Sequence, residues 1–283
     1  MTTTSKLAGL IGLGIGPSMT PHLHESEGER QGFHYVYRLL DLDERGITPE
    51  RVGELVRAAQ LAGYDGLNIT YPVKQVVMAE LDALSPEAEA IGAVNTVVFT
   101  AEGAVGHNTD ATGYAAGFRR GLPDAPMDLV VQMGAGGAGS AVAHALVGLG
   151  ARQLVIVDVD PVRAQALAER TAATAGGDVR AAAPGEVAEL LARASGVVNC
   201  TPVGSAKLPG TPFDTAALHP GLWVSDVVYR PLRTQLILDA EAAGCRVLPG
   251  SGMAVGQAVD AFRLITGHEP DADAMAAELV GLV

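Results

Sequence analysis

The chain has 283 residues, of which 48% are hydrophobic and 18% are charged, so it is long enough for one large domain or two modest ones and too apolar to stay disordered. Its net charge of −13, with no basic run longer than Arg119-Arg120, excludes a typical nucleic-acid-binding surface. Two cysteines, Cys200 and Cys245, stand in no metal or redox spacing and are predicted to be buried thiols of a cytoplasmic protein.

The first region of the chain predicts strands that alternate with helices. Strands are expected over residues 7–13, 35–42, 67–70, 93–99 and 104–107. Helices are expected over residues 48–63, from Pro72 to about Leu84, and from Ala111 onward. The last two strands are joined by Ala101-Glu102-Gly103 and are expected to pair.

From Asp128 onward the chain repeats strand and helix more regularly, which predicts a parallel sheet covered on both faces. The expected strands are residues 129–133, 153–157, 179–181, 197–199, 223–228 and 246–248. The expected helices are residues 138–149, from Asp160-Pro161 onward, 184–193 and 233–243. Two final helices, residues 253–266 and 271–282, have no strand to follow and are expected to pack on the first region. The uncharged stretch over residues 129–151 has glycines in its middle, at positions 134, 136, 137 and 139, so it predicts a strand, a turn and a helix rather than a membrane span.

A glycine-rich turn follows the predicted strand at residues 129–133. Its sequence, Gly134-Ala135-Gly136-Gly137-Ala138-Gly139, has the spacing G-x-G-x-x-G and leads directly into a predicted helix. Glycines permit the tight turn and let the backbone approach a pyrophosphate, while the helix N-terminus offers N–H donors to the phosphates. All six residues are therefore predicted to bind a dinucleotide.

Asp158 ends the next predicted strand, where an acid can accept hydrogen bonds from the ribose of a bound adenosine. Asp160 follows it, and two carboxylates would repel the 2′-phosphate of NADP. Arg163, the nearest cation, lies about one helical turn further on. The sequence therefore favours NAD over NADP, although Asp158 and Asp160 could also be ordinary turn and N-cap residues.

Lysine is rare in this chain, since only Lys6, Lys74 and Lys207 occur among 19 basic residues. Lys74 follows a predicted strand and turn and is expected at the start of a helix, where a cation is disfavoured. A lysine can lose its proton when its surroundings lower its pKa, whereas an arginine cannot. Lys74 is thus either a proton shuttle or a solvated surface lysine. Asp110, which precedes another predicted helix, is either a functional acid in a crevice or an N-cap.

Six segments, taken in chain order, resemble the motifs of the shikimate/quinate dehydrogenase family over nearly the whole sequence. They are Ser18-Met19-Thr20-Pro21, Gly66-Leu67-Asn68-Ile69-Thr70-Tyr71-Pro72-Val73-Lys74, Gly92-Ala93-Val94-Asn95-Thr96, residues 106–113, the glycine loop at residues 134–139, and Gly252-Met253 with Gln257-Ala258.

This resemblance implies a two-domain α/β protein. Residues 1–110 and 250–283 would form the substrate-binding domain, and residues 111–249 would form a Rossmann-like, parallel-sheet domain that binds NAD. Lys74 would donate and accept the proton at the reacting hydroxyl, with Asp110 beside it. The implied substrate contacts are Ser18, Thr20, Thr70, Asn95, Tyr229 and Gln257. The implied cofactor contacts beyond the glycine loop are Asp158, Arg163, Thr201, Pro202, Val228, Gly250 and Met253.

The implied activity is the NAD-dependent oxidation of quinate to 3-dehydroquinate and of shikimate to 3-dehydroshikimate. Two departures from the NADP-dependent members favour NAD: Val157-Asp158-Val159-Asp160 replaces their Asn-Arg-Thr-like sequence, and Thr20 stands where they usually have serine. Both departures resemble the NAD-dependent enzymes of actinobacteria. A lysine that accepts the hydroxyl proton does what zinc does in other alcohol dehydrogenases, so no metal is expected.

Three alternatives stay open at this point. They are a biosynthetic NADP-dependent shikimate dehydrogenase, an aminoshikimate-type relative, and a non-catalytic quinate sensor. The sensor would have no reason to combine Lys74 and Asp110 with an intact glycine loop. The expected partners are quinate and shikimate, without nucleic acid or membrane, and the protein is expected to be a monomer or a homodimer.

Overall fold

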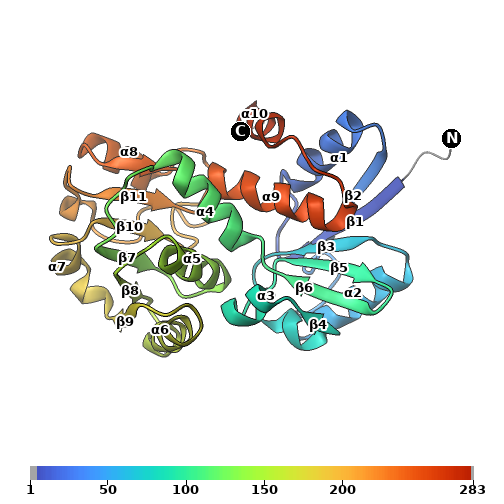
Figure 1. The fold of residues 1–283 in the computed structure, drawn as a ribbon, viewed down its shortest axis with the longest axis horizontal. Helices are drawn as coiled ribbons and strands as arrows, with labels where there is room; N and C mark the ends of the chain where they lie inside the picture. The colour runs from blue at the N-terminus through green and yellow to red at the C-terminus, as the bar shows by residue number, and fades with distance from the viewer. Residues whose placement is uncertain (1–4, 282–283) are drawn as a thin grey trace. The chain divides into compact units, whose positions relative to one another are not determined.

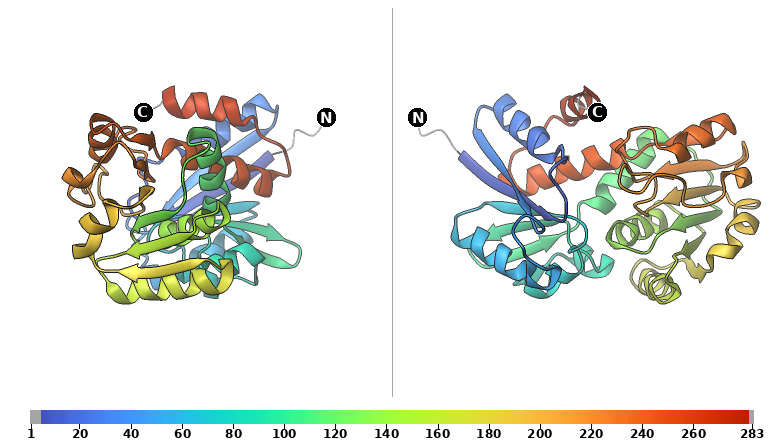
Figure 2. Two further views of the ribbon diagram at one scale, coloured as in Figure 1. Left: turned by 60° about the vertical axis from the view of Figure 1, so that its left-hand side comes forward. Right: turned by 180° about the vertical axis from the view of Figure 1, so that it is seen from behind.

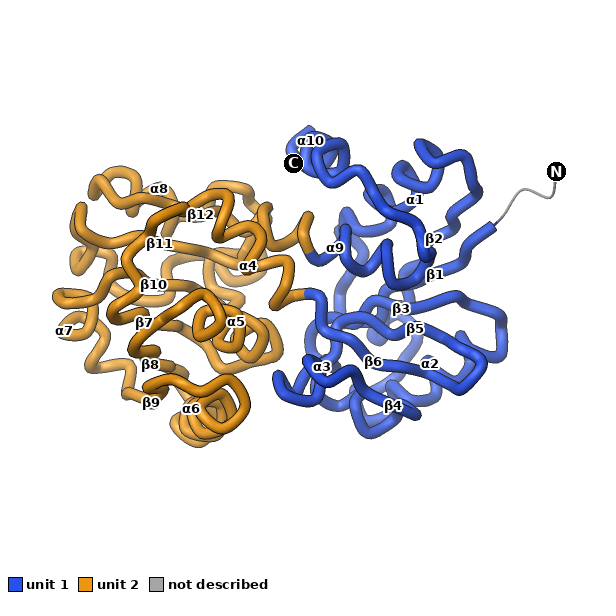
Figure 3. The backbone as a smooth tube through the Cα atoms, in the orientation of Figure 1, with its two compact units in different colours: residues 1–109, 257–282 blue, residues 110–256, 283 orange. Residues whose placement is uncertain are grey.

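Helices and strands alternate through most of the computed structural model, which describes residues 5–281 (Figure 1, Figure 2). The chain divides into two compact units, and within the described residues unit 1 contains residues 5–109 and 257–281 while unit 2 contains residues 110–256 (Figure 3). The chain leaves unit 1 between Thr109 and Asp110 and returns to it inside helix α9 (Ser251–Thr266).

Unit 1 is built on a mixed six-stranded sheet. Its strands are β1 (Ser5–Gly12), β2 (His34–Asp41), β3 (Gly66–Ile69), β4 (Ala83–Leu84), β5 (Thr96–Thr100) and β6 (Gly103–His107). The order across the sheet is β2-β1-β3-β5-β6-β4. β1 is parallel to β2 and β3, while β5 is antiparallel to β3 and β6, which confirms the predicted pair of extended segments.

The helices of unit 1 cover this sheet and include the C-terminal segment. They are α1 (Thr20–Arg30), η1 (Pro49–Arg51), α2 (Val52–Leu61), η2 (Val76–Glu80), α3 (Pro86–Ile91), the second half of α9, and α10 (Ala272–Gly281). Val56 of α2 packs in one hydrophobic core with Leu67 of β3. Phe262 of α9 packs in a second core with Tyr35 of β2. α1 and α10 lie side by side (Figure 1, Figure 2), so the end of the chain completes the first region.

Unit 2 contains six parallel strands. They are β7 (Leu129–Met133), β8 (Gln153–Val157), β9 (Asp178–Ala182), β10 (Gly196–Asn199), β11 (Trp223–Asp226) and β12 (Arg246–Leu248). The order across the sheet is β9-β8-β7-β10-β11-β12, and all neighbouring pairs are parallel. Counted within the unit, this is the order 3-2-1-4-5-6 of dinucleotide-binding folds. The predicted α/β fold with a Rossmann-like parallel sheet is therefore confirmed.

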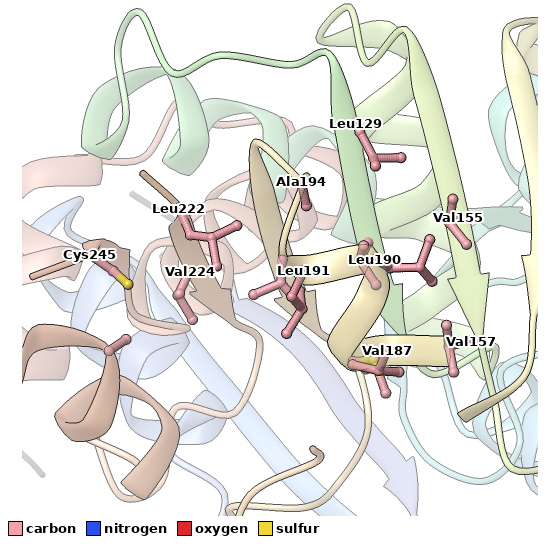
Figure 4. Packing of buried hydrophobic residues seen from close by; sticks show 14 of the residues in the cluster. Leu129, Val155, Val157, Val187, Leu190, Leu191, Ala194, Leu222, Val224 and Cys245 are labelled. Atoms are coloured by element: carbon pink, nitrogen blue, oxygen red, sulfur yellow. The ribbon is translucent and has the colours of Figure 1, made fainter. Parts of the chain in front are cut away.

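Helices cover both faces of the parallel sheet. They are α4 (Asp110–Gly121), α5 (Gly137–Gly148), α6 (Pro161–Ala175), η3 (Pro184–Glu186), α7 (Val187–Leu191), η4 (Thr215–Ala217) and α8 (Gln235–Ala242). Leu190 and Leu191 of α7 pack against alternate strand residues such as Val155 and Val224 (Figure 4). α5 and α6 contact β7, β8 and β9 and cover the opposite face. No helix within residues 5–281 is both long and apolar enough to cross a bilayer.

The predicted helix from Pro72 to about Leu84 is wrong. The chain there forms a turn, then the short 3-10 helix η2, and then β4, which pairs with β6. Asp82 stabilises this alternative, because its N–H donates to the carbonyl of Ala104 at 3.0 Å and its carboxylate accepts the N–H of Ala104 at 2.8 Å. Helices α1 and α3 were not predicted.

Candidate active site

Two hydroxyls that were predicted to contact substrate lie at the start of α1. The Oγ of Ser18 donates to the Oγ1 of Thr20 at 3.1 Å and accepts the N–H of Thr20 at 3.3 Å. The loop before them is fixed by Asp41 at the end of β2, whose buried carboxylate accepts the N–H groups of Gly14 at 3.0 Å and Ile15 at 2.7 Å. Asp41 belongs to none of the motifs, and its place at the end of a strand was the only signal for it.

Thr70 and Lys74 lie on the turn that follows β3. The N–H of Thr70 donates to the carbonyl of Ile11 at 2.9 Å, and the carbonyl of Thr70 accepts the N–H of Val73 at 3.1 Å. The carbonyl of Lys74 accepts the N–H of Val94 at 2.8 Å, which anchors the backbone of this half-buried residue. Lys74 therefore lies in a hydrogen-bonded turn and not at the start of an α-helix, so the helix-dipole argument does not apply to it.

Asn95 and Gln257, two further predicted substrate residues, are joined through Thr109. The Oδ1 of Asn95 accepts the N–H of Thr109 at 2.8 Å, and its Nδ2 donates to the Oγ1 of Thr109 at 2.9 Å. The same hydroxyl donates to the carbonyl of Gln257 at 3.0 Å. Asn95 is only 2% exposed, so its amide is held in one place inside unit 1.

Asp110 is the first residue of α4 and of unit 2, and it is buried. A carboxylate in the first turn of a helix is stabilised by the partial positive charge of the helix N-terminus. Lys74 belongs to unit 1, so contact between these two predicted catalytic residues stays a prediction. The same holds for Tyr229 of unit 2 and the predicted substrate residues of unit 1.

The glycine loop in unit 2 adopts the conformation that its spacing predicts. Gly134 has a φ of +99°, which residues with a side chain rarely adopt. A Cβ on Gly139 would lie 2.3 Å from the carbonyl oxygen of Gly134, so no larger residue fits there. The Nε2 of Gln132 donates to the carbonyls of Gly134 and Gly139 at 2.9 Å each and fixes both ends of the loop.

A carboxylate and a guanidinium both border this loop. The Oδ2 of Asp158, after β8, accepts the N–H of Ala135 at 2.7 Å, and its Oδ1 accepts the N–H of Asp160 at 3.0 Å. A Cβ on Gly136 would meet only the Nη2 of Arg163, at 3.6 Å, within the distance of van der Waals contact. The backbone at Gly136 is thus open to a close approach, as a dinucleotide pyrophosphate at the N-terminus of α5 requires.

A buried carboxylate, Asp226 at the end of β11, connects the segments that follow β10 and β11. Its Oδ1 accepts from the Nδ2 of Asn199 and from the N–H of Val228, both at 2.9 Å, and its Oδ2 accepts the hydroxyl of Thr234 at 2.7 Å. The Oδ1 of Asn199 accepts the N–H and the hydroxyl of Thr201, at 3.0 and 2.7 Å. Burial raises the pKa of Asp226 to about 6, against the opposing effect of these hydrogen bonds. Asp226 was not predicted.

The remaining predicted cofactor residues lie on these segments or on α9. A Cβ on Gly134 would be 3.0 Å from the backbone nitrogen of Thr201, so the Thr201-Pro202 segment packs against the glycine loop. A Cβ on Gly250 would be 2.8 Å from the carbonyl oxygen of Val228. Tyr229 follows and is half-buried, and burial raises the pKa of its phenol.

Met253 is half-buried in the first turn of α9. Within unit 2, the structure therefore places the Thr201-Pro202 segment, Asp158 and Arg163 at the glycine loop and Val228 beside Gly250.

Two family models match the chain. Residues 10–97 match the shikimate dehydrogenase substrate binding domain, and residues 250–280 match the shikimate 5′-dehydrogenase C-terminal domain. The two matches lie at the ends of the sequence and bracket the glycine loop.

The chain is also similar to proteins over its full length. It is 58% identical to a shikimate dehydrogenase (NADP(+)) of Streptomyces avermitilis, over 100% of this chain and 97% of that protein. It is 51% identical to a quinate/shikimate dehydrogenase (NAD(+)) of Corynebacterium efficiens, over 100% of both chains. Its structure resembles that of a quinate dehydrogenase from Corynebacterium glutamicum in complex with NAD, with a TM-score of 0.91, 45% identity, and 98% and 100% of the two chains covered.

Proposed function

The chain belongs to the shikimate dehydrogenase family, and on that premise we propose that it oxidises quinate to 3-dehydroquinate and shikimate to 3-dehydroshikimate with NAD. When bound, the nicotinamide supplies a reversible acceptor for the hydride that leaves the ring carbon. The protein then has three tasks: to bind the cyclic polyol, to hold the dinucleotide and to move the hydroxyl proton.

Lys74 and Asp110 carry the proton transfer in this proposal. The amine of Lys74 accepts the proton of the reacting hydroxyl during oxidation and returns it in the reverse direction. Asp110 orients the ammonium group that forms. The hydrogen bond from Val94 to the carbonyl of Lys74 supports this role, because it limits the positions that the amine can reach.

The substrate contacts fall into two groups, one for the substrate carboxylate and one for its ring hydroxyls. They are Ser18, Thr20 and Tyr229 in the first group and Thr70, Asn95 and Gln257 in the second. The hydrogen bond between the Ser18 and Thr20 hydroxyls supports the first assignment, since it holds both oxygens in one loop.

The dinucleotide would be held by the loop at residues 134–139 and by residues around it. Those residues are Asp158, Arg163, Thr201, Pro202, Val228, Gly250 and Met253. The open backbone at Gly136 and the N-terminus of α5 support this assignment.

One observation carries the choice of NAD: the carboxylate of Asp158 is fixed at the glycine loop by the N–H groups of Ala135 and Asp160. The ribose hydroxyls of NAD can donate to such a carboxylate. The 2′-phosphate of NADP would bring a like charge to it, and two unit charges about 4 Å apart repel by about 4 kcal/mol near a protein surface.

A specific observation favours NADP as the second candidate. The guanidinium of Arg163 also lies at the loop, and arginine binds phosphate well. The similar Streptomyces avermitilis protein is named an NADP-dependent enzyme. Arg163 can serve the pyrophosphate of either dinucleotide, whereas Asp158 suits only NAD.

Initial rates with quinate and shikimate, each with NAD and NADP, test the function. We expect activity on both substrates and a kcat/KM at least about tenfold higher with NAD, which corresponds to about 1.4 kcal/mol. Asp158→Ala should raise the KM for NAD and reduce the preference, while Asp160→Asn, which keeps a capping side chain, should change it less. A preference of the unaltered enzyme for NADP would overturn the cofactor assignment.

We also propose the domain bounds, the cytoplasmic location and the oligomeric state that are expected from the sequence. Residues 1–110 and 250–283 would form the substrate-binding domain and residues 111–249 the NAD-binding domain. The separate sheets of the two units support a division into two domains, although the compact units divide at residues 109/110 and 256/257. Cys200 and Cys245 are free thiols, which suits the cytoplasm.

Light scattering during size-exclusion chromatography would test whether the protein is a monomer or a homodimer.

A further inference from the structure

A chain of buried hydrogen bonds in unit 1 leads from β2 to the amide of Asn95. The hydroxyl of Tyr37 donates to the Oδ1 of Asn68 at 2.7 Å. The Nδ2 of Asn68 donates to the Oγ1 of Thr96 at 3.0 Å, and that hydroxyl donates to the Oδ1 of Asn95 at 3.1 Å. The Nδ2 of Asn95 then donates to Thr109. Tyr37 and Thr96 have no role in the proposed reaction, so their place in this chain needs a reason.

Backbone groups fix the direction of every bond in the chain. The Nδ2 of Asn68 also faces the carbonyl of Asn95 at 3.3 Å, so the nitrogen must be on that side and the oxygen must face Tyr37. The N–H of Thr109 requires an acceptor, so the Oδ1 of Asn95 must face it. The hydroxyl of Thr109 gives its proton to the carbonyl of Gln257 and can only accept from Asn95.

Two further contacts do not change this direction. The Oγ1 of Thr96 also lies 3.4 Å from the Oγ1 of Thr109, but the Oδ1 of Asn95, at 3.1 Å, is the nearer acceptor for the Thr96 proton. The Oγ1 of Thr109 also lies 3.3 Å from the Oδ1 of Asn95, but the carbonyl of Gln257, at 3.0 Å, is the nearer acceptor for the Thr109 proton.

Burial prevents the hydrogen bonds from Tyr37 to Asn95 from reversing their direction. Tyr37, Asn68, Thr96 and Asn95 are all at most 4% exposed, so water cannot replace a lost partner. Burial raises the pKa of Tyr37 well above its usual value, so its hydroxyl keeps the proton that it donates. The ring of His24 lies 4.9 Å from that of Tyr37, and burial lowers the pKa of His24 to about 3, so this neighbour stays uncharged.

We propose that Tyr37 and Thr96 are positioning residues that hold the Asn95 amide so that it offers an N–H, and not its oxygen, to the ligand. The inference rests on the proposed function, in which Asn95 contacts a ring hydroxyl of quinate or shikimate. That ring hydroxyl must then accept a hydrogen bond from the Asn95 amide and donate its own proton to another group. A ligand with an ammonium group at this ring position can only donate, so the site rejects it.

Substitutions that each remove one hydroxyl group test this chain of hydrogen bonds. We expect Tyr37→Phe to raise the KM for quinate and shikimate about fivefold and Thr96→Val about tenfold, as for the loss of one buried hydrogen bond. Thr96→Ser keeps the hydroxyl and should restore the KM to within about twofold of the original value. The KM for NAD and kcat should stay within about twofold in all three variants, because Lys74 and the glycine loop are untouched.

Thr266→Val is the matched control. Its hydroxyl is buried in unit 1 and donates to the carbonyl of Phe262 at 2.7 Å, outside the chain that ends at Asn95. It should lower the melting temperature about as much as Thr96→Val does and leave the KM for quinate unchanged. A similar rise in the KM for quinate in this control variant would overturn a role specific to the hydrogen-bond chain that ends at Asn95.

A double-mutant cycle separates positioning from a purely structural effect. If Tyr37 acts through Asn95, then Tyr37→Phe should raise the KM for quinate in the native background and leave it unchanged in an Asn95→Ala background. The same fold-change in both backgrounds would overturn the inference and leave the proposed function intact. An Asn95→Ala enzyme with a normal KM for both substrates would overturn the proposed role of Asn95 itself. Should Tyr37→Phe fail to fold, the comparison of Thr96→Ser with Thr96→Val in the two Asn95 backgrounds gives the same decision.

Discussion

Lysine and arginine should behave differently at position 74, although both carry a positive charge. We expect Lys74→Ala to lower kcat by about 10²–10⁴-fold, the usual contribution of a general acid–base group, with a much smaller change in the KM for quinate. Lys74→Arg should lose nearly as much activity, because arginine does not release its proton. Steady-state kinetics measure both variants against Lys207→Ala, which changes an exposed loop lysine. An active Lys74→Arg enzyme would contradict proton transfer by this residue.

The raised pKa of Asp226 predicts the direction in which the stability of the protein changes with pH. Because burial raises its pKa from 3.8 to about 6, the folded protein binds this proton more tightly than the unfolded chain does. The stabilisation is complete below the unfolded pKa and is lost as the pH rises through about 6, and a shift of about two units corresponds to about 3 kcal/mol. Asparagine has no such proton, so the melting temperature of the native protein minus that of Asp226→Asn should increase as the pH falls.

Thermal denaturation of the two proteins at about pH 7.5 and about pH 5 measures this difference. The other carboxylates titrate alike in both proteins, so their contributions cancel. A difference in melting temperature that is the same at both pH values would contradict a raised pKa for Asp226.

Helix α1 shows why one element escaped prediction from the sequence. Its buried residues include Leu23, His24 and Glu27, and the carboxylate of Glu27 pairs with Arg30 at 2.8 Å. Hydrophobic periodicity detects a helix by its apolar face, and this helix buries a largely polar one. By contrast, most strands of the two sheets contain short apolar runs, and all of them except β4 were predicted.

The segment after Pro72 shows the opposite error, a helix predicted where there is none. Its apolar residues suit a helix, but pairing of β4 with β6 and the hydrogen bonds of Asp82 favour another conformation. The same limit applies to the candidate site. Residues in the motifs could be named from the sequence, whereas those that hold them act on distant segments and become visible only in the fold. These are Asp41, Asp226 and Tyr37. Gln132 and Thr96 lie beside the residues that they hold, but their contacts also become visible only in the fold.

Helices α4 and α9 approach each other closely at Gly113 and Gly256, which predicts the effect of a larger residue there. A Cβ on Gly256 would lie 2.7 Å from the Cα and 2.9 Å from the carbonyl oxygen of Gly113, which are backbone atoms that cannot rotate away. Gly256→Ala should therefore lower the free energy of unfolding by about 1–3 kcal/mol. Gly148→Ala in α5 meets nothing within 4 Å and should be neutral or stabilising by up to about 1 kcal/mol. Urea denaturation compares the two variants, and equal stabilities would contradict close packing of these helices.

At the scale of the molecule, each unit has its own sheet and its own hydrophobic core. The proposed contacts with the polyol lie mostly in unit 1, and those with the dinucleotide lie in unit 2. A ligand slows local opening of the segments that it contacts, and it stabilises the protein by about 2.7 kcal/mol at about a hundredfold excess over its Kd. The two ligands should therefore protect different parts of the chain.

Amide hydrogen exchange measures this division directly. NAD alone should slow exchange in residues 134–139 and 158–163, because it orders the glycine loop and the segment after β8. Quinate alone should slow exchange in residues 18–20 and 66–74, which carry hydroxyls and Lys74. Asp158→Ala should reduce the protection by NAD and leave that by quinate unchanged. Protection of residues 66–74 by NAD without quinate, or of residues 134–139 by quinate without NAD, would contradict the assignment of these two segments to different ligands.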